Sequence, residues 1–120
     1  MIADPQFEGK QSFILQTYVD YIKSAGARVV PIILEDDWEV TKAKLDRING
    51  MLFPGGGKGG GYDDMGQQIF DYLYEKNEQG TYFPMFGICL GMQKLVKYAA
   101  KNKYSILGDY PIFKYLPLDF

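Results

Sequence analysis

Apolar positions along the chain follow two alternating patterns, helical spacing and short continuous runs. Over residues 14–25, apolar side chains recur at steps of three and four residues, which predicts a helix with one buried face. That face consists of Ile14, Tyr18, Tyr21, Ile22 and Ala25. Gly26 follows, and glycine readily adopts the left-handed conformation that ends a helix. RVVPII over residues 28–33 then predicts a strand, in which Pro31 favours an edge position or a bulge because proline lacks an N–H.

Two more helices and a strand follow in the same manner. A short helix is predicted over residues 35–48, with Asp36 or Asp37 as its N-cap. MLFP, residues 51–54, predicts a short apolar strand that leads directly into a run of glycines. A third helix is predicted over about residues 63–78. Its inward positions are Met65, Ile69, Tyr72 and Leu73.

The last part of the chain adds one strand and one helix of clear pattern. YFPMFG, residues 82–87, predicts a buried strand, and LGMQKLVKYAAKN, residues 90–102, predicts a helix. The inward face of that helix is expected to be Met92, Leu95, Val96 and Ala99. YSIL, residues 104–107, fits one more short strand, whereas the aromatic and proline-rich end of the chain fits neither pattern.

This alternation of strand and helix predicts an α/β fold. Parallel strands joined by right-handed helical crossovers build a sheet with helices on both faces, so we expect three layers. Ligand-binding and reactive groups in such a sheet lie at the carboxyl ends of the strands. Two of these ends are chemically unusual here: PGGG after MLF, and GICLG after FPMF.

Composition and charge limit the classes of function. The chain has 120 residues, enough for one small domain, and a net charge of −2 without a basic stripe, so nucleic acid is not an expected partner. No apolar run is long enough for a transmembrane helix, and the opening MIADPQFEGK lacks the pattern of a signal peptide. A single cysteine cannot form an internal disulfide, so the compartment stays unknown. No metal or cofactor is expected.

The segment GICLG, residues 87–91, contains the only cysteine of the chain, Cys89. It fits the G-x-nucleophile-x-G pattern of a strand-to-helix turn, the nucleophile elbow. In that turn the nucleophile has a strained backbone, and its neighbours two positions away approach other backbone so closely that only glycine fits. Unpaired N–H groups at the start of the helix favour an anion, and the N–H of Leu90 is a natural oxyanion donor. The alternative is a buried structural cysteine between two packing glycines.

The glycine run GGGKGGG is the second candidate feature. The backbone N–H groups of Gly55 and Gly56 are expected to point into the site as further oxyanion donors, where a side chain would block the approach. Nucleotide binding is an alternative, because Gly55, Gly57 and Gly60 formally satisfy G-x-G-x-x-G. Six glycines in seven residues make that match nearly automatic. A P-loop is excluded, since Lys58 is followed by glycine. For the last glycines of the run, a flexible surface loop is the structural alternative.

Four blocks of the sequence, in order, resemble the class I glutamine amidotransferase-like superfamily, and within it the γ-glutamyl hydrolases of peptidase family C26. The blocks are YVDYIKSAGARVVPI, RINGMLFPGGG, GTYFPMFGICLGMQKL and YPIFKYLPLDF, and they span about Tyr18 to Phe120. The resemblance implies a flavodoxin-like α/β domain, of which residues 1–120 would be the N-terminal part. It also implies a cysteine hydrolase that acts on folate polyglutamates or other γ-glutamyl peptides.

By the same resemblance, Cys89 is the nucleophile that attacks the γ-carbonyl of the substrate and forms a γ-glutamyl thioester, which water hydrolyses. The N–H groups of Gly56 and Leu90 would form the oxyanion hole, and Gly55 and Gln93 would contact the substrate. Hydrolases of the family more often carry glutamate where Gln93 stands, whereas amidotransferases commonly carry glutamine. A glutaminase-type amidotransferase fragment is therefore an alternative, and a polar residue on the first turn of a helix is the structural one.

The general base of the family is a histidine in a later motif, and the 120 residues contain none. The leaving amine needs a proton donor and the deacylating water needs a base, whereas Asp63 and Asp64 are expected to be solvated residues at a helix start. The domain is therefore expected to be incomplete and the chain inactive alone. It is interpreted as a piece of an enzyme completed by another polypeptide that covers its strand edge, as a catalytically dead structural or binding subunit, or as an incomplete product.

Overall fold

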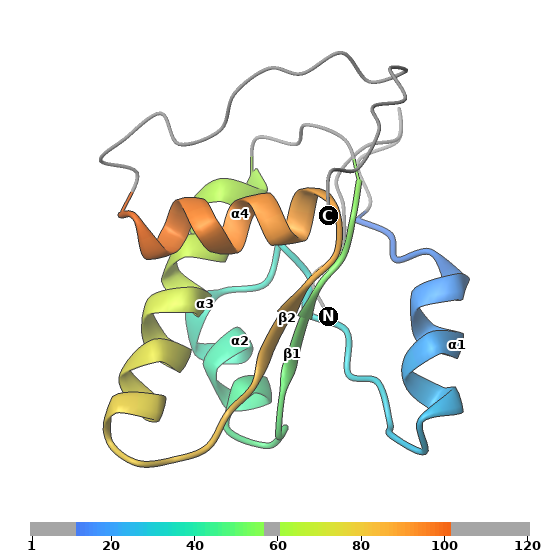
Figure 1. The fold of residues 1–120 in the computed structure, drawn as a ribbon, viewed down its shortest axis with the longest axis horizontal. Helices are drawn as coiled ribbons and strands as arrows, with labels where there is room; N and C mark the ends of the chain where they lie inside the picture. Colours follow the sequence, from blue (N-terminus) through green and yellow to red (C-terminus); the bar gives the residue numbers. More distant parts are fainter. Residues whose placement is uncertain (1–11, 57–60, 102–120) are drawn as a thin grey trace, which may run out of the picture.

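The computed structural model describes residues 12–56 and 61–101, and within them helices and strands alternate (Figure 1). The helices are α1 Gln16–Ser24, α2 Trp38–Leu45, α3 Gly61–Glu78 and α4 Leu90–Ala99, and the strands are β1 Met51–Phe53 and β2 Met85–Gly87. The predicted strand at residues 104–107, the aromatic end of the chain and Gly57–Gly60 lie outside the described residues.

β1 and β2 form a two-stranded parallel sheet, in which Met51 lies opposite Met85 and Phe53 lies opposite Gly87. A parallel pair needs a crossover connection, and α3 supplies it. The predicted mixed α/β class is confirmed. The strand predicted over residues 28–33 is wrong, because only Ile32 makes an isolated bridge there. Pro31 has no N–H to extend a ladder, and the sheet of the described residues consists of β1 and β2 alone.

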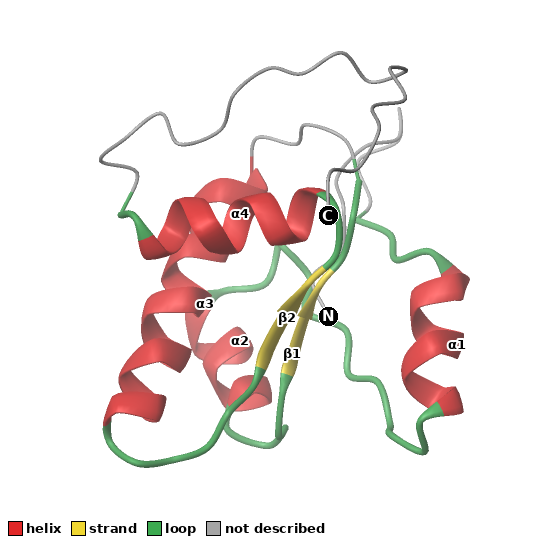
Figure 2. Cartoon of the chain, viewed as in Figure 1, coloured by secondary structure: helices red, strands yellow, loops and turns green. Residues whose placement is uncertain are grey.

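The two strands lie between α1 on one side and α2 and α3 on the other, and α4 packs against the strands and α3 (Figure 2). The side chains at the centre of the core come from β1, α3, α4 and the segments around α2. They are Ile32, Leu45, Met51, Phe53, Ile69, Phe70, Leu73, Phe83 and Tyr98. All three residues of β1 are buried, as expected for a strand covered on both faces.

The buried faces of the helices agree only in part with those that their apolar spacing predicts. α3 follows the prediction, with Ile69 and Leu73 fully buried. In α4 the predicted inward face is correct for Leu95, which packs against the core, and wrong for Met92 and Val96, which are 49% and 45% exposed. Tyr98, which was not predicted to face inward, is 1% exposed. α4 docks on β1 through Gly91, and Tyr98 follows two turns later on the same face. Met92 and Val96 lie at least about 100° round the helix from that face, because an α-helix has 3.6 residues per turn. In α1 no residue is fully buried, and Tyr18 is half-buried.

Local signals at the ends of the helices agree with the structure. Gly26 closes α1 with a φ of +81°, and Asp37 is the N-cap position of α2, although its side chain accepts no capping hydrogen bond. After α3, the side chain of Asn77 substitutes for a backbone turn. Its amide donates to the carbonyls of Leu73 and Phe83, and its oxygen accepts the N–H of Phe83 at 3.0 Å. The α3–β2 connection therefore has a fixed path.

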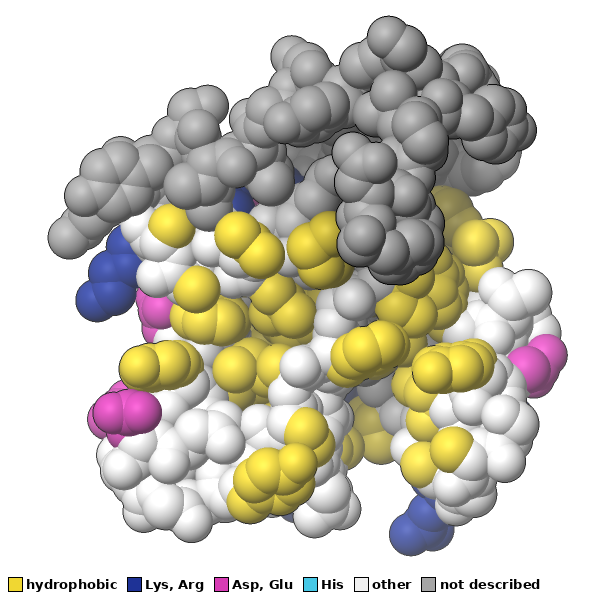
Figure 3. All heavy atoms as spheres, in the orientation of Figure 1, with side chains coloured by type: hydrophobic (Ala, Val, Ile, Leu, Met, Phe, Trp, Pro, Cys, Tyr) yellow, Lys and Arg dark blue, Asp and Glu magenta, His cyan; other side chains and the backbone are white. Residues whose placement is uncertain are grey.

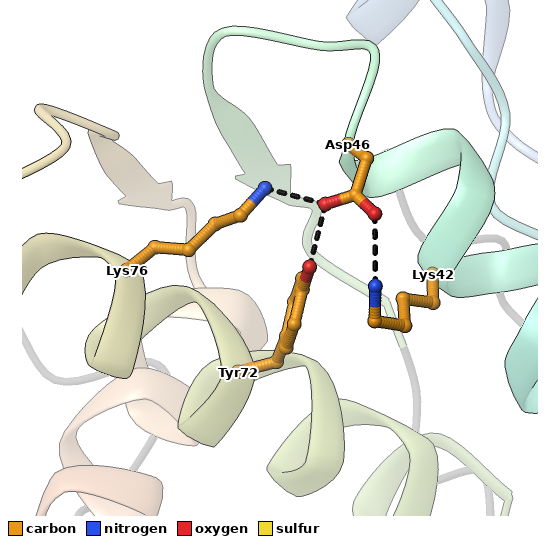
Figure 4. A network of polar contacts seen from close by, with 4 residues as sticks. All are labelled: Lys42, Asp46, Tyr72 and Lys76. Atoms are coloured by element: carbon orange, nitrogen blue, oxygen red, sulfur yellow. Dashed lines mark hydrogen bonds and ion pairs between the residues drawn. The ribbon is translucent and has the colours of Figure 1, made fainter. Parts of the chain in front are cut away.

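A polar network on the surface joins α2 to α3 (Figure 4). Asp46 Oδ1 accepts hydrogen bonds from Lys76 Nζ at 2.6 Å and from Tyr72 Oη at 2.5 Å, and its Oδ2 accepts from Lys42 Nζ at 3.0 Å. The hydrogen bond from Lys76 has the largest effect, and together the three bonds hold the pKa of the Asp46 carboxyl well below its usual range. Trp38 packs edge-on against the Tyr72 ring, so the network lies over an aromatic contact.

Candidate active site

Cys89 lies in a sharp turn between β2 and α4, at the N-cap of α4. Its backbone has a φ of +51° and a ψ of −115°, and its side chain is exposed. A positive φ at a residue other than glycine is uncommon and stores strain, which native proteins concentrate at functional sites. The strained strand-to-helix corner expected from the G-x-C-x-G pattern is therefore present in the structure.

The two glycines that flank Cys89 are sterically required. A Cβ on Gly87 would lie 2.6 Å from the nitrogen of Met92, and one on Gly91 would lie 2.5 Å from the carbonyl carbon of Phe53 and overlap its oxygen. That oxygen also accepts the N–H of Ile88 at 3.0 Å. Ile88 before the cysteine and Gly91 after it therefore both approach the carbonyl of Phe53 at the end of β1.

The start of α4 presents backbone N–H groups beside Cys89. The N–H of Gly91 donates to the carbonyl of Ile88 at 2.9 Å, and that of Gln93 donates to the carbonyl of Cys89 at 3.1 Å. Leu90 is the first residue of the helix, so its N–H has no acceptor within α4. The side chain of Gln93 is exposed on the first turn.

The glycine loop meets the elbow where β1 ends. A Cβ on Gly55 would lie 3.1 Å from the Cβ of Cys89, so the two unusual strand ends are brought together. The N–H of Gly55, however, donates to the hydroxyl oxygen of Tyr18 at 2.9 Å. The expectation that this N–H points freely into the site is therefore wrong, since it is already bonded. Gly56 follows as an exposed residue, and the rest of the loop, Gly57–Gly60, lies outside the described residues.

Tyr18 is the residue near Cys89 that sequence reasoning missed. Its helical spacing assigned it to the buried face of α1, which predicted a packing role. No local signal could have found its contact with Gly55, because the hydrogen bond spans 37 positions of the chain.

Lys94 and Asp63 join the elbow helix to the start of α3. Lys94 Nζ forms an ion pair with the carboxylate of Asp63, whereas the sequence indicated that Asp63 would be a solvated helix-start residue. Tyr98, one turn further along α4, is buried, and burial, assisted by the charges of Asp63 and Asp64, raises the pKa of its phenol. These contacts tie the loop-side end of α3 to the helix that carries Cys89.

Clusters of metal ligands and membrane-spanning helices are both absent from the described residues. In residues 12–56 and 61–101, no cluster of three or more histidine, cysteine, aspartate or glutamate side chains is arranged to hold a metal ion. Within the same ranges, none of the helices combines the length and the apolar character that crossing a membrane requires.

Comparison with known proteins identifies the family. Residues 3–101 match the family model of peptidase C26, a range that includes both the glycine loop and the elbow. The chain belongs to the peptidase C26 family. The resemblance to family C26 found in the sequence is confirmed, and the match covers all of the described residues.

Curated relatives of this C26 chain carry the name γ-glutamyl hydrolase. This chain is 37% identical over 114 residues to γ-glutamyl hydrolase B of Dictyostelium discoideum. The matched region covers 91% of this chain and 33% of that protein. The chain is 38% identical over 93 residues to probable γ-glutamyl hydrolase 3 of Arabidopsis thaliana, covering 77% and 26%. With γ-glutamyl hydrolase of Rattus norvegicus the identity is 37% over 111 residues, covering 90% and 35%. The chain thus spans between about a quarter and a third of the length of these relatives.

Proposed function

We propose that this chain supplies the nucleophile half of a γ-glutamyl hydrolase active site, with Cys89 as the nucleophile. The observation that carries the proposal is the strained backbone of Cys89 at the first turn of α4, with Gly55 in contact beside it. Relatives named γ-glutamyl hydrolases support this chemistry over amidotransfer, although Gln93 is the residue type typical of amidotransferases.

In the proposed mechanism, the Cys89 sulfur attacks the γ-carbonyl of the substrate. The N–H groups of Leu90 and Gly56 stabilise the negative charge that develops on the carbonyl oxygen, because donors held in place need no rearrangement during the reaction. Collapse of the tetrahedral adduct breaks the bond to the leaving amine and leaves a γ-glutamyl thioester on the sulfur. Gly55 and Gln93 line the space in which the glutamyl group lies, and water then hydrolyses the thioester.

Two proton transfers in this mechanism need a partner that the 120 residues do not provide. The leaving amine requires a proton and the hydrolytic water requires a base, roles that a histidine usually fills. The sequence contains no histidine, and Asp63 is paired with Lys94. We therefore propose that the chain forms a thioester from an activated substrate but does not turn over amide substrates by itself.

An apolar groove supports the further proposal that residues 1–120 are the N-terminal part of a larger flavodoxin-like, three-layer domain of the class I glutamine amidotransferase-like type. The groove runs between α1 with the segment after it and β1, where Ile22, Val29 and Leu52 contribute to its wall. Figure 3 shows apolar side chains gathered over the strands and along α1. Because β1 bonds β2 through Met51 and Phe53, the N–H and C=O of Leu52 point away from β2, toward this side.

The occupant that fits this groove is a further parallel strand from polypeptide outside these 120 residues. An unpaired strand edge beside apolar side chains is suited to pair with another strand. The relatives match over only about a third of their length, so they contain the additional polypeptide that such a strand requires. Two measurements test this. The intact mass of the native assembly is expected to include a further chain that carries a histidine, and a photoreactive amino acid placed at Val29 or Ile22 is expected to crosslink to that chain. A 13.7 kDa monomer with no such chain contradicts it.

The acylation step can be tested on the chain alone. N-acetyl-glutamate γ-(4-nitrophenyl) ester has a leaving group that departs as the anion and needs no proton donor. The Cys89 sulfur forms a bond to the γ-carbonyl carbon, the ester C–O bond breaks, nitrophenolate leaves, and the thiol proton goes to solvent. We expect one equivalent of nitrophenolate per chain without further turnover, and a peptide containing Cys89 that carries one N-acetyl-γ-glutamyl group.

Three comparisons make this test decisive. Cys89→Ser removes the nucleophile and should abolish the burst, and the matched α-(4-nitrophenyl) ester should react much more slowly if the site recognises the γ-glutamyl arrangement. Acylation no faster than that of the chain in urea means that the elbow does not activate the thiol, which leaves the structural or binding subunit as the better interpretation. Steady release of glutamate from a γ-glutamyl peptide by the purified chain, lost in Cys89→Ser, contradicts the proposal of inactivity.

A further inference from the structure

A tyrosine of α1 reaches the glycine loop beside Cys89. Tyr18 is half-buried, and its hydroxyl oxygen accepts the N–H of Gly55 at 2.9 Å. A Cβ on Gly55 would meet that hydroxyl oxygen at 2.7 Å and the Cβ of Cys89 at 3.1 Å, so the tyrosine and the cysteine converge on one α-carbon. This hydrogen bond therefore joins the candidate site to α1, whereas Gly55 and Cys89 themselves follow the ends of β1 and β2.

We propose that Tyr18 is a positioning residue that fixes the glycine loop against the nucleophile elbow, a role that rests on the proposed function of Cys89. The tyrosine occupies the Gly55 N–H, which leaves the next N–H along the chain, that of Gly56, as the loop's donor to the oxyanion. Since Gly56 is joined directly to the anchored residue, holding Gly55 restricts where the Gly56 N–H can lie.

The anchor is needed because the loop has no side chains of its own to pack. Glycine has the largest conformational freedom of any residue, so an unanchored Gly55–Gly56 pair would have to be ordered during the reaction. Donors that are ordered beforehand stabilise a developing oxyanion without that cost. No residue of α1 is fully buried. Within the described residues, the hydrogen bond from the Gly55 N–H to the Tyr18 hydroxyl oxygen links this helix to the site.

A reversible aldehyde separates this role from general stability. N-acetyl-glutamate γ-semialdehyde, labelled with ¹³C at the aldehyde carbon, should add the Cys89 thiol: the S–C bond forms, the C=O π bond breaks, and the thiol proton goes to the oxygen. NMR measures the dissociation constant of this hemithioacetal, whose oxygen lies where the oxyanion would. We expect Tyr18→Phe to weaken the adduct about tenfold, a smaller effect than the loss of a whole oxyanion donor. Alkylation of Cys89 by iodoacetamide, which needs no oxyanion hole, should keep its rate.

Tyr21→Phe is the matched control, because Tyr21 lies on the same helix and is 59% exposed. It should leave the adduct unchanged. Equal dissociation constants for Tyr18→Phe and the wild-type chain overturn the inference about Tyr18 alone, whereas absence of any adduct in the wild-type chain overturns the proposed function of Cys89. Amide exchange at Gly55 in the wild-type chain needs no variant: protection supports the anchor, and exchange as fast as in the unfolded chain contradicts it.

Discussion

Replacing Gly91 by alanine tests whether α4 docks on β1 as the elbow requires. In an uncrowded helix, glycine to alanine stabilises by about 1 kcal/mol, because alanine has the better helix propensity. Here the added carbon would lie 2.5 Å from the carbonyl carbon of Phe53 and overlap its oxygen. Carbon atoms pack at about 3.5 Å or more, so α4 and β1 would have to separate by about 1 Å.

A change of side-chain rotamer cannot relieve this overlap, because the added Cβ is fixed to the backbone of α4 and it meets the backbone carbonyl of Phe53 in β1. Overpacking in a core costs about 1–3 kcal/mol and occasionally more. The displaced carbonyl of Phe53 also holds the N–H of Ile88, so the hydrogen bond next to Cys89 is strained as well. The overlap involves backbone atoms, so we take the upper end of that range, and after subtracting the helix-propensity gain of about 1 kcal/mol we expect Gly91→Ala to lower the free energy of unfolding by about 2 kcal/mol. Typical domains have a total of about 5–15 kcal/mol.

Urea unfolding followed by the fluorescence of Trp38, the only tryptophan, measures this change. Gly80→Ala is the control, since an added Cβ there meets nothing within 4 Å and only its φ of +89° is unfavourable. That variant should lose about 1 kcal/mol. A Gly91→Ala chain as stable as the wild type, with an unchanged m-value, would refute the close approach of α4 to β1 and with it the elbow geometry.

Three further predictions concern the body of the fold. Thr41 is fully buried and, among the described residues, its hydroxyl has no hydrogen-bond partner, so Thr41→Val should raise the free energy of unfolding by about 1 kcal/mol in urea melts. The pKa of Asp46 is depressed in the folded chain, so its bonds stabilise above pH 3.8 and are lost as the pH falls further; Asp46→Asn should flatten that acid dependence. Burial raises the pKa of Tyr98, so folding stability should fall as the pH rises above 10, with a smaller slope in Tyr98→Phe if this phenol is responsible.

Local structure in this chain follows directly from residue type and spacing. The apolar period of three and four residues located α3 and its buried Ile69 and Leu73, and glycine at position 26 ended α1 as expected. The elbow at Cys89 could be read from five residues, since only glycine tolerates the approach that the turn imposes. These features depend on a few neighbouring residues, so the sequence alone determined them.

Contacts between distant segments required the tertiary structure. Of the predicted inward face of α4, Leu95 packs against the core but Met92 and Val96 are exposed, because a period specifies a stripe but not which neighbour covers it. RVVPII had the composition of a strand, yet strand formation depends on a pairing edge that the pattern cannot provide. Likewise, the sequence determined the position of Cys89 between its two glycines, whereas only the fold decided that the Gly55 N–H bonds the Tyr18 hydroxyl. Residues 37 positions apart meet only once helix and strand have packed.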